Sequence, residues 1–284
     1  MAIQTAGGGP TPSSSVADPT LAADPTLHLP RLLCLHGGGV TGDVFRAQAR
    51  SLTRQLSPYF RLVFADGPFL CDPGPGILPV YADWGPFRRW LRWLPAHDEI
   101  DKESAVEEIG FALRTAMERD DGRGEWVGLV GFSQGAKLAA SLLFEAQARA
   151  EAEEQHAEEE EGGLDWLPRW KFAVLLAGRH PLVSLSPRTA HPALVSAAAI
   201  SEGFDYPGEV EDKLRLPTVH VHGLQDPGLH LHRRLLRQYC DKDTVTVVEW
   251  EGSHRVPIKM NDIVPIVDAT LDAAVRAGVY SRRP

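Results

Sequence analysis

In the stretch Val127-Gly128-Leu129-Val130-Gly131-Phe132-Ser133-Gln134-Gly135, an apolar run typical of a buried strand ends abruptly in the pattern Gly-x-Ser-x-Gly. Residues 136–143 follow at once and are mostly alanine and leucine, which favour a helix. Between a strand and a helix, this pattern presents the serine at a tight elbow as a nucleophile. A Cβ at Gly131 or Gly135 would obstruct the close approach of the strand and the helix. We therefore predict that Ser133 is a nucleophile rather than part of a chance match on a loop.

Five further apolar runs predict strands on both sides of this elbow. They cover residues 32–36, 60–65, 172–177, 218–223 and 244–250. Strands that alternate with amphipathic helices form a parallel sheet that is covered on both faces. Because the chain shows no internal repeat and no second core, we predict a single α/β domain with a mainly parallel central sheet.

Three of the helices can be placed from the signals at their ends. Asp43 is a candidate N-cap for a helix that continues to about residue 52. Ser104 and Glu107 have the spacing of a capping box, which predicts the start of a second helix. A last helix over about residues 262–277 is expected to stop at Gly278.

Two segments depart from the alternating pattern. Residues 1–29 are rich in Ala, Gly, Pro, Ser and Thr, which predicts a disordered tail before a domain that spans residues 30–284. Residues of about 146–163 form an acidic block that ends in two glycines. We interpret this block as a solvated helix extension or a mobile insertion, with a binding tail as the alternative.

The composition of the 284-residue chain limits its partners and its location. A formal net charge of -9 argues against binding to nucleic acid or to an anionic membrane surface. No apolar run is long enough to cross a bilayer, and the N-terminus lacks the basic start and apolar core of a signal peptide. Cys34, Cys71 and Cys240 are widely spaced and fit free thiols, so we predict a cytoplasmic protein.

A serine nucleophile needs a base within hydrogen-bond reach and a third group that orients the base. In an open parallel sheet, such groups gather after the carboxyl ends of the strands. Asp226 directly follows the predicted strand 218–223, and with Pro227 it also fits a helix start, a role compatible with catalysis. Weaker candidates lie on less well-placed connections, namely Asp205, Asp241 and Asp243.

His254 is the predicted base. It lies on a glycine-containing loop after the strand 244–250, where the base is needed. Among the 11 histidines of the chain it stands out by this position, whereas His220 and His222 are most simply strand residues. The chain order Ser133, Asp226, His254 is the one expected of this architecture. We therefore predict these three residues as the catalytic triad.

The oxyanion formed during acyl transfer needs two backbone N–H donors. One is expected from Gln134, the residue after the nucleophile, at the start of the helix. The other is expected from the loop His36-Gly37-Gly38-Gly39, where we choose Gly38, with Gly39 next. The alternative is that this glycine loop only turns tightly.

No metal ion and no cofactor is predicted. The chain contains no His-x-x-x-His, no paired cysteine motif and no phosphate-binding glycine pattern. The glycine loop at residues 37–39 follows a strand but lacks the spacing of a dinucleotide-binding fingerprint.

The stretch 81–93 combines three tryptophans with three arginines. Large aromatic groups at the mouth of a site can line an apolar acyl pocket, so Trp84, Phe87 and Trp90, together with Gly39, are candidate pocket residues. The arginines could meet a phosphate or an acidic protein surface. The alternative is a short amphipathic helix that caps the sheet, with Trp90 and Trp93 buried and the arginines solvated.

Five separate pieces of the chain match one known pattern: Leu35-His36-Gly37-Gly38-Gly39, Phe64-Ala65-Asp66-Gly67-Pro68, the stretch from Pro73-Gly74-Pro75-Gly76 to Trp93, Gly131-Phe132-Ser133-Gln134-Gly135, and Gly252-Ser253-His254. Together they resemble the FSH-type (family of serine hydrolases) branch of the α/β-hydrolases, which is common in fungi. The resemblance covers roughly residues 31–277. The Gly-Pro and aromatic stretch points to this branch, since Gly-Phe-Ser-Gln-Gly alone is shared with acyl-protein thioesterases and carboxylesterases.

The resemblance implies an α/β-hydrolase fold and hydrolysis of an acyl ester or thioester through an acyl-enzyme. Several members of the branch are encoded with polyketide synthases, where they release or trim the acyl chain. A polyketide thioester presented by an acyl carrier domain of a polyketide synthase is therefore the implied substrate. Two alternatives stay open: a stand-alone carboxylesterase for small free esters, and a catalytically dead hydrolase fold that acts as a binding scaffold.

Overall fold

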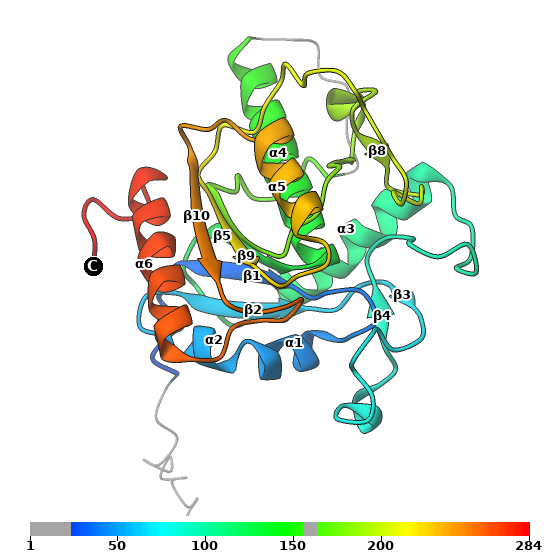
Figure 1. Cartoon of the computed structure of the whole chain (residues 1–284). Helices are drawn as coiled ribbons and strands as arrows, with labels where there is room; N and C mark the ends of the chain where they lie inside the picture. The colour runs from blue at the N-terminus through cyan, green and yellow to red at the C-terminus, as the bar shows by residue number, and fades with distance from the viewer. Residues whose placement is uncertain (1–23, 156–163) are drawn as a thin grey trace, which may run out of the picture.

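The computed structural model describes residues 24–155 and 164–284 of the chain. A six-stranded sheet lies at its centre in the order β10-β9-β6-β5-β1-β2 (Figure 1). Every neighbouring pair of strands in this sheet is parallel. The strands are β1 (Arg31–Leu35), β2 (Arg61–Ala65), β5 (Trp126–Phe132), β6 (Phe172–Leu176), β9 (Thr218–Gly223) and β10 (Val245–Trp250). The predicted α/β fold with a mainly parallel sheet is thus confirmed.

Helices cover both faces of the sheet and give the molecule three layers (Figure 1). One face packs against α1 (Gly42–Gln48), α2 (Arg50–Leu56) and α6 (Met260–Arg276). The other face packs against α3 (Lys102–Glu118), α4 (Gln134–Glu154) and α5 (Leu229–Tyr239). Two apolar cores therefore form, one on each side of the strands. Within the described ranges, no helix combines the length and the apolar character needed to span a bilayer.

Short elements lie in the two long connections that follow β2 and β6. They are β3 (Phe69–Leu70), the 3-10 helix η1 (Ala82–Trp84), β4 (Arg88–Arg89), β7 (Val183–Ser184), the 3-10 helix η2 (Pro187–Thr189) and β8 (Val195–Ser196). β3 pairs antiparallel with β4, and β7 pairs in parallel with β8. Residues 81–93 thus contain a 3-10 turn and a two-residue strand, so the alternative of an amphipathic helix is wrong here.

The central strand β5 is buried along its whole length between β1 and β6. It leads directly into α4, as the sequence predicts, and the two glycines of the elbow allow the close approach. A Cβ on Gly131 would overlap the carbonyl oxygen of Gly135, and a Cβ on Gly135 would overlap that of Leu35. Any side chain at either position would therefore push α4 away from the sheet.

Two predicted helix caps are wrong by a few residues. Thr41 rather than Asp43 caps α1, because its extended backbone lets the hydroxyl accept from Val44 N–H at 3.2 Å. Asp101 rather than Ser104 caps α3, because its carboxylate accepts from both the N–H and the hydroxyl of Ser104, at 2.8 and 2.7 Å. The predicted first helix is also divided at Ala49 into α1 and α2.

The predicted tail and acidic block are only partly described. Residues 1–23 and 156–163 lie outside the described residues. Residues 24–29 form turns held to the domain, where Arg123 N–H donates to the Leu27 carbonyl at 2.6 Å and Arg61 pairs with Asp24. For these six residues the prediction of a disordered tail is wrong. Residues 146–154 continue α4, in agreement with a helix extension.

Candidate active site

Ser133 lies at the elbow between β5 and α4 with a φ of 53° and a ψ of -112°. Residues other than glycine rarely adopt this conformation, which costs about 1–3 kcal/mol. Hydrogen bonds secure the turn, because Ser133 N–H donates to the Leu176 carbonyl at 2.9 Å and the Ser133 carbonyl accepts from Ala136 and Lys137 N–H. The strain therefore persists because the neighbouring strand and helix hold the turn on both sides.

The three residues predicted as a triad meet at the carboxyl edge of the sheet. His254 Nε2 lies 2.9 Å from Ser133 Oγ, and His254 Nδ1 lies 2.6 Å from Asp226 Oδ2. Ser133 follows β5, Asp226 follows β9 and His254 follows β10. In this arrangement the imidazole can take the serine proton at one nitrogen while the carboxylate orients it at the other.

The Asp226 carboxylate is fully buried, and each of its two oxygens has a hydrogen-bond partner. Its Oδ1 accepts from Gly228 N–H at 2.7 Å, while its Oδ2 faces His254. Burial raises the pKa of Asp226, but the hydrogen bonds from Gly228 and His254 outweigh it and hold the pKa below the usual range. Asp226 therefore stays ionised. It is not the N-cap of α5, since Gly228 takes that place.

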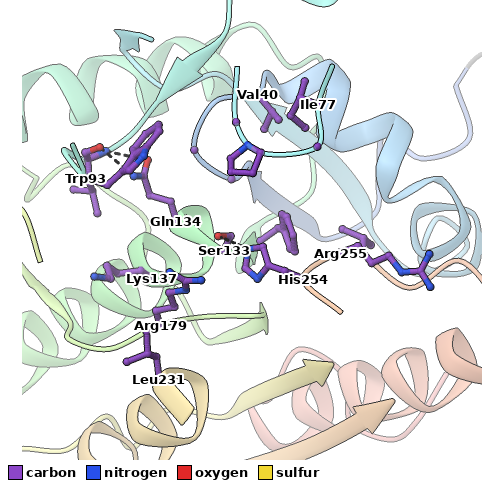
Figure 2. A pocket seen from close by; sticks show the side chains of 18 of the residues that line it. Val40, Ile77, Trp93, Ser133, Gln134, Lys137, Arg179, Leu231, His254 and Arg255 are labelled. Carbon is purple, nitrogen blue, oxygen red and sulfur yellow. Dashed lines mark hydrogen bonds between the residues drawn. The ribbon is translucent and has the colours of Figure 1, made fainter. Parts of the chain in front are cut away.

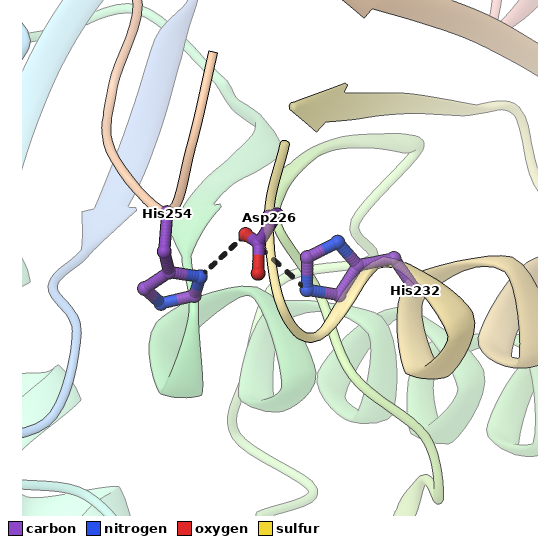
Figure 3. Close-up of side chains that lie close together, drawn as sticks. All are labelled: Asp226, His232 and His254. Atoms are coloured by element: carbon purple, nitrogen blue, oxygen red, sulfur yellow. Dashed lines mark hydrogen bonds and ion pairs between the residues drawn. The ribbon is translucent and has the colours of Figure 1, made fainter. Parts of the chain in front are cut away.

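A second imidazole lies against the same carboxylate (Figure 3). His232 Nε2 is 3.8 Å from Asp226 Oδ2, and the side chain is completely buried. Burial lowers the pKa of His232 far below its ordinary value, so the ring is neutral and this contact is not an ion pair. Asp226, His232 and His254 bring ligand-type atoms within 4.8 Å of one another. Within this group, His254 and Asp226 are joined directly by the 2.6 Å hydrogen bond between Nδ1 and Oδ2.

The glycine loop after β1 supplies a candidate oxyanion donor beside Ser133. Gly39 N–H is engaged with the Arg88 carbonyl at 2.9 Å, so Gly38 is the better candidate of the two. Gly38 also lines the cavity described below, as does Gln134. Gln134 is the first residue of α4, where an N–H has no acceptor within the helix and points out of its end. Both residues expected to donate therefore line the cavity that contains the nucleophile.

Buried contacts hold this glycine loop in place. The His36 ring is fully buried, where its Nδ1 meets the Gly37 carbonyl at 2.7 Å and its Nε2 accepts from Gly67 N–H at 2.8 Å. Burial lowers the pKa of His36 to about 4, so the ring is neutral. Trp90 Nε1 donates to the His36 carbonyl at 3.1 Å. The Gln134 side chain in turn bonds to the backbone of Trp90 and Leu91.

A cavity of about 970 Å³ opens over Ser133 and His254 (Figure 2). Its apolar and aromatic lining comes from several connections, including Val40, Ile77, Tyr81, Trp93, Phe132 and Phe204. The polar groups that line it include the Ser133 and His254 pair, Gln134, Ser201, Glu202 and a set of basic side chains. Such a volume accommodates a large acyl group.

The four residues proposed from sequence as pocket residues are not among those that line this cavity. Gly39 turns the loop at a φ of +76°, and Trp84 is 44% exposed and packs on Tyr81. Phe87 is buried with Val40 and Ile77. Trp90 is fully buried, as expected from the alternative in which this tryptophan packs inside the domain. The pocket wall comes instead from their neighbours, among them Leu91 and Trp93.

A model of the family described as serine hydrolase (FSH1) matches residues 26–266. The chain belongs to this family. The resemblance stated from the sequence is thereby confirmed, and so is the prediction that the protein is a serine hydrolase.

Curated relatives of this FSH1-family serine hydrolase are named esterases. Esterase pigG of Monascus ruber is 53% identical over 271 residues, which cover 92% of this chain and 97% of that protein. The probable esterase tazC of Aspergillus terreus is 50% identical over 266 residues, which cover 90% and 96%. Among solved structures, the Bacillus cereus carboxylesterase aligns with a TM-score of 0.49 at 18% identity, covering 86% of this chain and 89% of that chain.

Sequence reasoning missed two basic residues of this serine hydrolase that face the cavity. Lys137 lies one helical turn after Ser133, and Arg179 follows β6. A signal for Lys137 was present, since it is the only charged residue in the alanine- and leucine-rich run 136–143. Arg179 gave no such signal, because its approach to Lys137 depends on the path of the chain after β6.

Proposed function

We propose that this serine hydrolase cleaves an acyl ester or thioester through a covalent acyl-enzyme on Ser133. The observation that carries the proposal is the 2.9 Å contact between His254 Nε2 and Ser133 Oγ, with His254 Nδ1 held by Asp226. The names of the relatives, esterases at 53% and 50% identity, support the ester-cleaving chemistry.

The proposed reaction uses each of these groups at a defined atom. Ser133 Oγ attacks the acyl carbonyl while His254 Nε2 takes its proton, and Asp226 stabilises the imidazolium that forms. The N–H groups of Gln134 and Gly38 donate to the oxyanion. His254 then gives the proton to the leaving alcohol or thiol, and a water activated by the same nitrogen hydrolyses the acyl-enzyme.

We further propose that the acyl group is a polyketide chain delivered as a thioester by an acyl carrier domain of a polyketide synthase in fungal secondary metabolism. The resemblance of the motifs to the branch encoded with polyketide synthases supports this proposal. The cavity of about 970 Å³ supports it too, because it is large for a short-chain ester. The cytoplasmic location stays a prediction; the cysteines Cys34, Cys71 and Cys240 are free thiols, as expected for a reducing compartment.

Labelling by a fluorophosphonate probe tests the chemistry. The wild-type protein should be labelled once, and Ser133→Ala should abolish the labelling while the protein stays folded. Labelling that persists in Ser133→Ala would show that the nucleophile is another residue. No turnover of a broad ester and thioester panel by the folded wild type would favour the binding-scaffold alternative.

A substrate comparison tests the finer proposal. The catalytic efficiency toward an acyl thioester on a carrier domain is measured beside that toward short nitrophenyl esters with the same acyl group. We expect the carrier-bound thioester to be the better substrate. If only the free esters turn over efficiently, the protein is a stand-alone carboxylesterase.

A further inference from the structure

The cavity over Ser133 is basic although the chain as a whole is acidic. The chain has a formal net charge of -9. Among the described residues, the cavity lining nevertheless contains one carboxylate, Glu202, against a set of cationic side chains: Arg50, Arg92, Lys137, Arg179, Arg234 and Arg255. Charge of one sign in a recessed site attracts a ligand of the opposite sign.

Some of these cations have partners within the protein. Arg92 lies 3.5 Å from Glu99, and Arg234 pairs with Asp205. Arg50 and Arg255 are exposed to solvent at the rim of the cavity. The remaining two, Lys137 and Arg179, are the ones that approach each other beside the nucleophile.

Lys137 is a buried cation without a carboxylate partner in the described parts of the chain. The residue is 7% exposed, and its Nζ donates to the neutral hydroxyl of Ser201 at 2.6 Å. Burial, together with the nearby charge of Arg179, lowers the pKa of Lys137 to about 7. A buried charge without a counter-charge is unfavourable, so packing alone does not explain a lysine at this place.

Arg179 completes the cationic pair from a different element. It lies in the loop after β6, against Gly228 of the Asp226 loop, and its Nε has no hydrogen-bond partner among the described residues. Figure 2 shows Lys137 and Arg179 close together on the same side of Ser133. The two side chains thus bring positive charge to the cavity lining from α4 and from the loop at the carboxyl end of β6.

We propose that Lys137 and Arg179 form an anion subsite that binds a carboxylate carried by the acyl chain of the substrate, an inference that rests on the proposed hydrolysis at Ser133. An acidic group bound there supplies the missing counter-charge and accepts hydrogen bonds from both cations. The subsite selects acyl chains with a terminal acid over neutral chains of the same length.

The place of the subsite assigns the anion to the acyl chain rather than to the carrier. Lys137 lies in the first turn of α4, directly after the elbow that carries Ser133, and both residues line the same cavity. A carboxylate only a few bonds from the scissile carbonyl can reach both groups. The phosphate of a carrier arm is separated from its thioester by the whole pantetheine chain and lies beyond this reach.

A pair of isosteric esters tests the proposal. Monoethyl glutarate carries a free carboxylate, and ethyl 4-carbamoylbutanoate carries a neutral carboxamide in its place. Ethanol release gives kcat/KM for both esters with the wild type, Lys137→Met, Arg179→Met and the control Lys171→Met. Lys171 precedes β6 at the opposite edge of the sheet and pairs with Glu125, so its replacement changes the charge equally without touching the cavity.

We expect Lys137→Met and Arg179→Met to lower kcat/KM for the acidic ester about 10- to 100-fold, the range of one charge-assisted hydrogen bond. The carboxamide ester should change less than threefold, and Lys171→Met should change neither. Equal losses for both esters would show that Lys137 only supports the Ser201 loop and would overturn the proposal. A loss confined to thioesters of phosphopantetheine, compared with pantetheine, would overturn it in favour of a carrier phosphate.

Binding to Ser133→Ala separates the subsite from the chemistry. Monoethyl glutarate should raise the melting temperature of Ser133→Ala, and ethyl 4-carbamoylbutanoate should raise it less. In Ser133→Ala combined with Lys137→Met, this difference should disappear. If monoethyl glutarate binds no better than ethyl 4-carbamoylbutanoate to Ser133→Ala, the subsite is refuted whatever the activity. If monoethyl glutarate binds better than the carboxamide ester but the wild type hydrolyses no ester, the proposed function fails while the subsite stands.

Discussion

Replacing Gln134 with methionine separates the two roles that this residue has at the elbow. Its backbone N–H is the proposed oxyanion donor and is unchanged by the substitution. Its side chain accepts from Trp90 N–H at 2.7 Å and from Leu91 N–H at 3.1 Å, and it donates to the Leu91 carbonyl at 3.0 Å. Methionine has a similar volume but makes none of these three hydrogen bonds.

The expected loss follows from those contacts. Each hydrogen bond contributes about 0.5–1.5 kcal/mol, so three together stabilise the fold by about 2–4 kcal/mol. For a chain of this size, that loss lowers the melting temperature by about 4–16 °C. Activity should fall as well, because Trp90 holds the His36 carbonyl and hence the loop with Gly38. We expect kcat/KM to drop about tenfold or more, part of the loss that follows removal of an oxyanion donor.

Gln147→Met is the matched control for this substitution. Gln147 is also on α4, and its side chain also bonds to a distant backbone, at the Lys213 carbonyl (3.0 Å) and at Arg215 N–H (2.6 Å). It does not line the cavity. Denaturant unfolding should show a loss of stability in both variants, whereas ester hydrolysis should fall only in Gln134→Met. Equal kcat/KM values for the two variants would refute the link between the Gln134 side chain and the oxyanion loop.

Three further predictions concern the triad, the buried imidazoles and the elbow. Asp226→Asn should lower kcat by about 10⁴, because an amide no longer holds His254 in the productive tautomer; a loss below tenfold would remove Asp226 from the triad. The free energy of unfolding should fall as the pH drops from about 6.5 to 4. In this range the histidines of the unfolded chain become protonated, whereas the buried histidines of the folded protein stay neutral. The folded pKa values of His36, about 4, and His220, about 3, lie well below the unfolded value. Each of these histidines therefore lowers the free energy of unfolding by about 1.4 kcal/mol for every unit by which the pH falls in this range. Urea unfolding at a series of pH values measures this slope, and a flat profile would contradict the burial of uncharged imidazoles. Gly131→Ala should abolish soluble folded protein or cost more than about 3 kcal/mol, since its Cβ would overlap a backbone carbonyl across the elbow; circular dichroism and thermal melting measure that loss.

Local sequence patterns predicted the elements of the sheet because each pattern is contained in neighbouring residues. The apolar run and the glycines around Ser133 determine a strand, a turn and a helix without help from the rest of the chain. Helix caps were less predictable, because several polar residues compete near each helix start. Thr41 and Asp101, rather than Asp43 and Ser104, are the N-caps because their backbones are extended, and the sequence does not reveal that conformation.

The sequence by itself determined the order of the strand-end residues, so Ser133, Asp226 and His254 could be placed at one edge of a parallel sheet. Only the tertiary structure decided which side chains surround them. Trp90 is buried behind the pocket, while Lys137 and Arg179 face it, although most of α4 and the whole of β6 lie between these two residues in the sequence. The physical reason is that the long connections take their paths from packing against distant elements, and those contacts have no signature in the residues next to them.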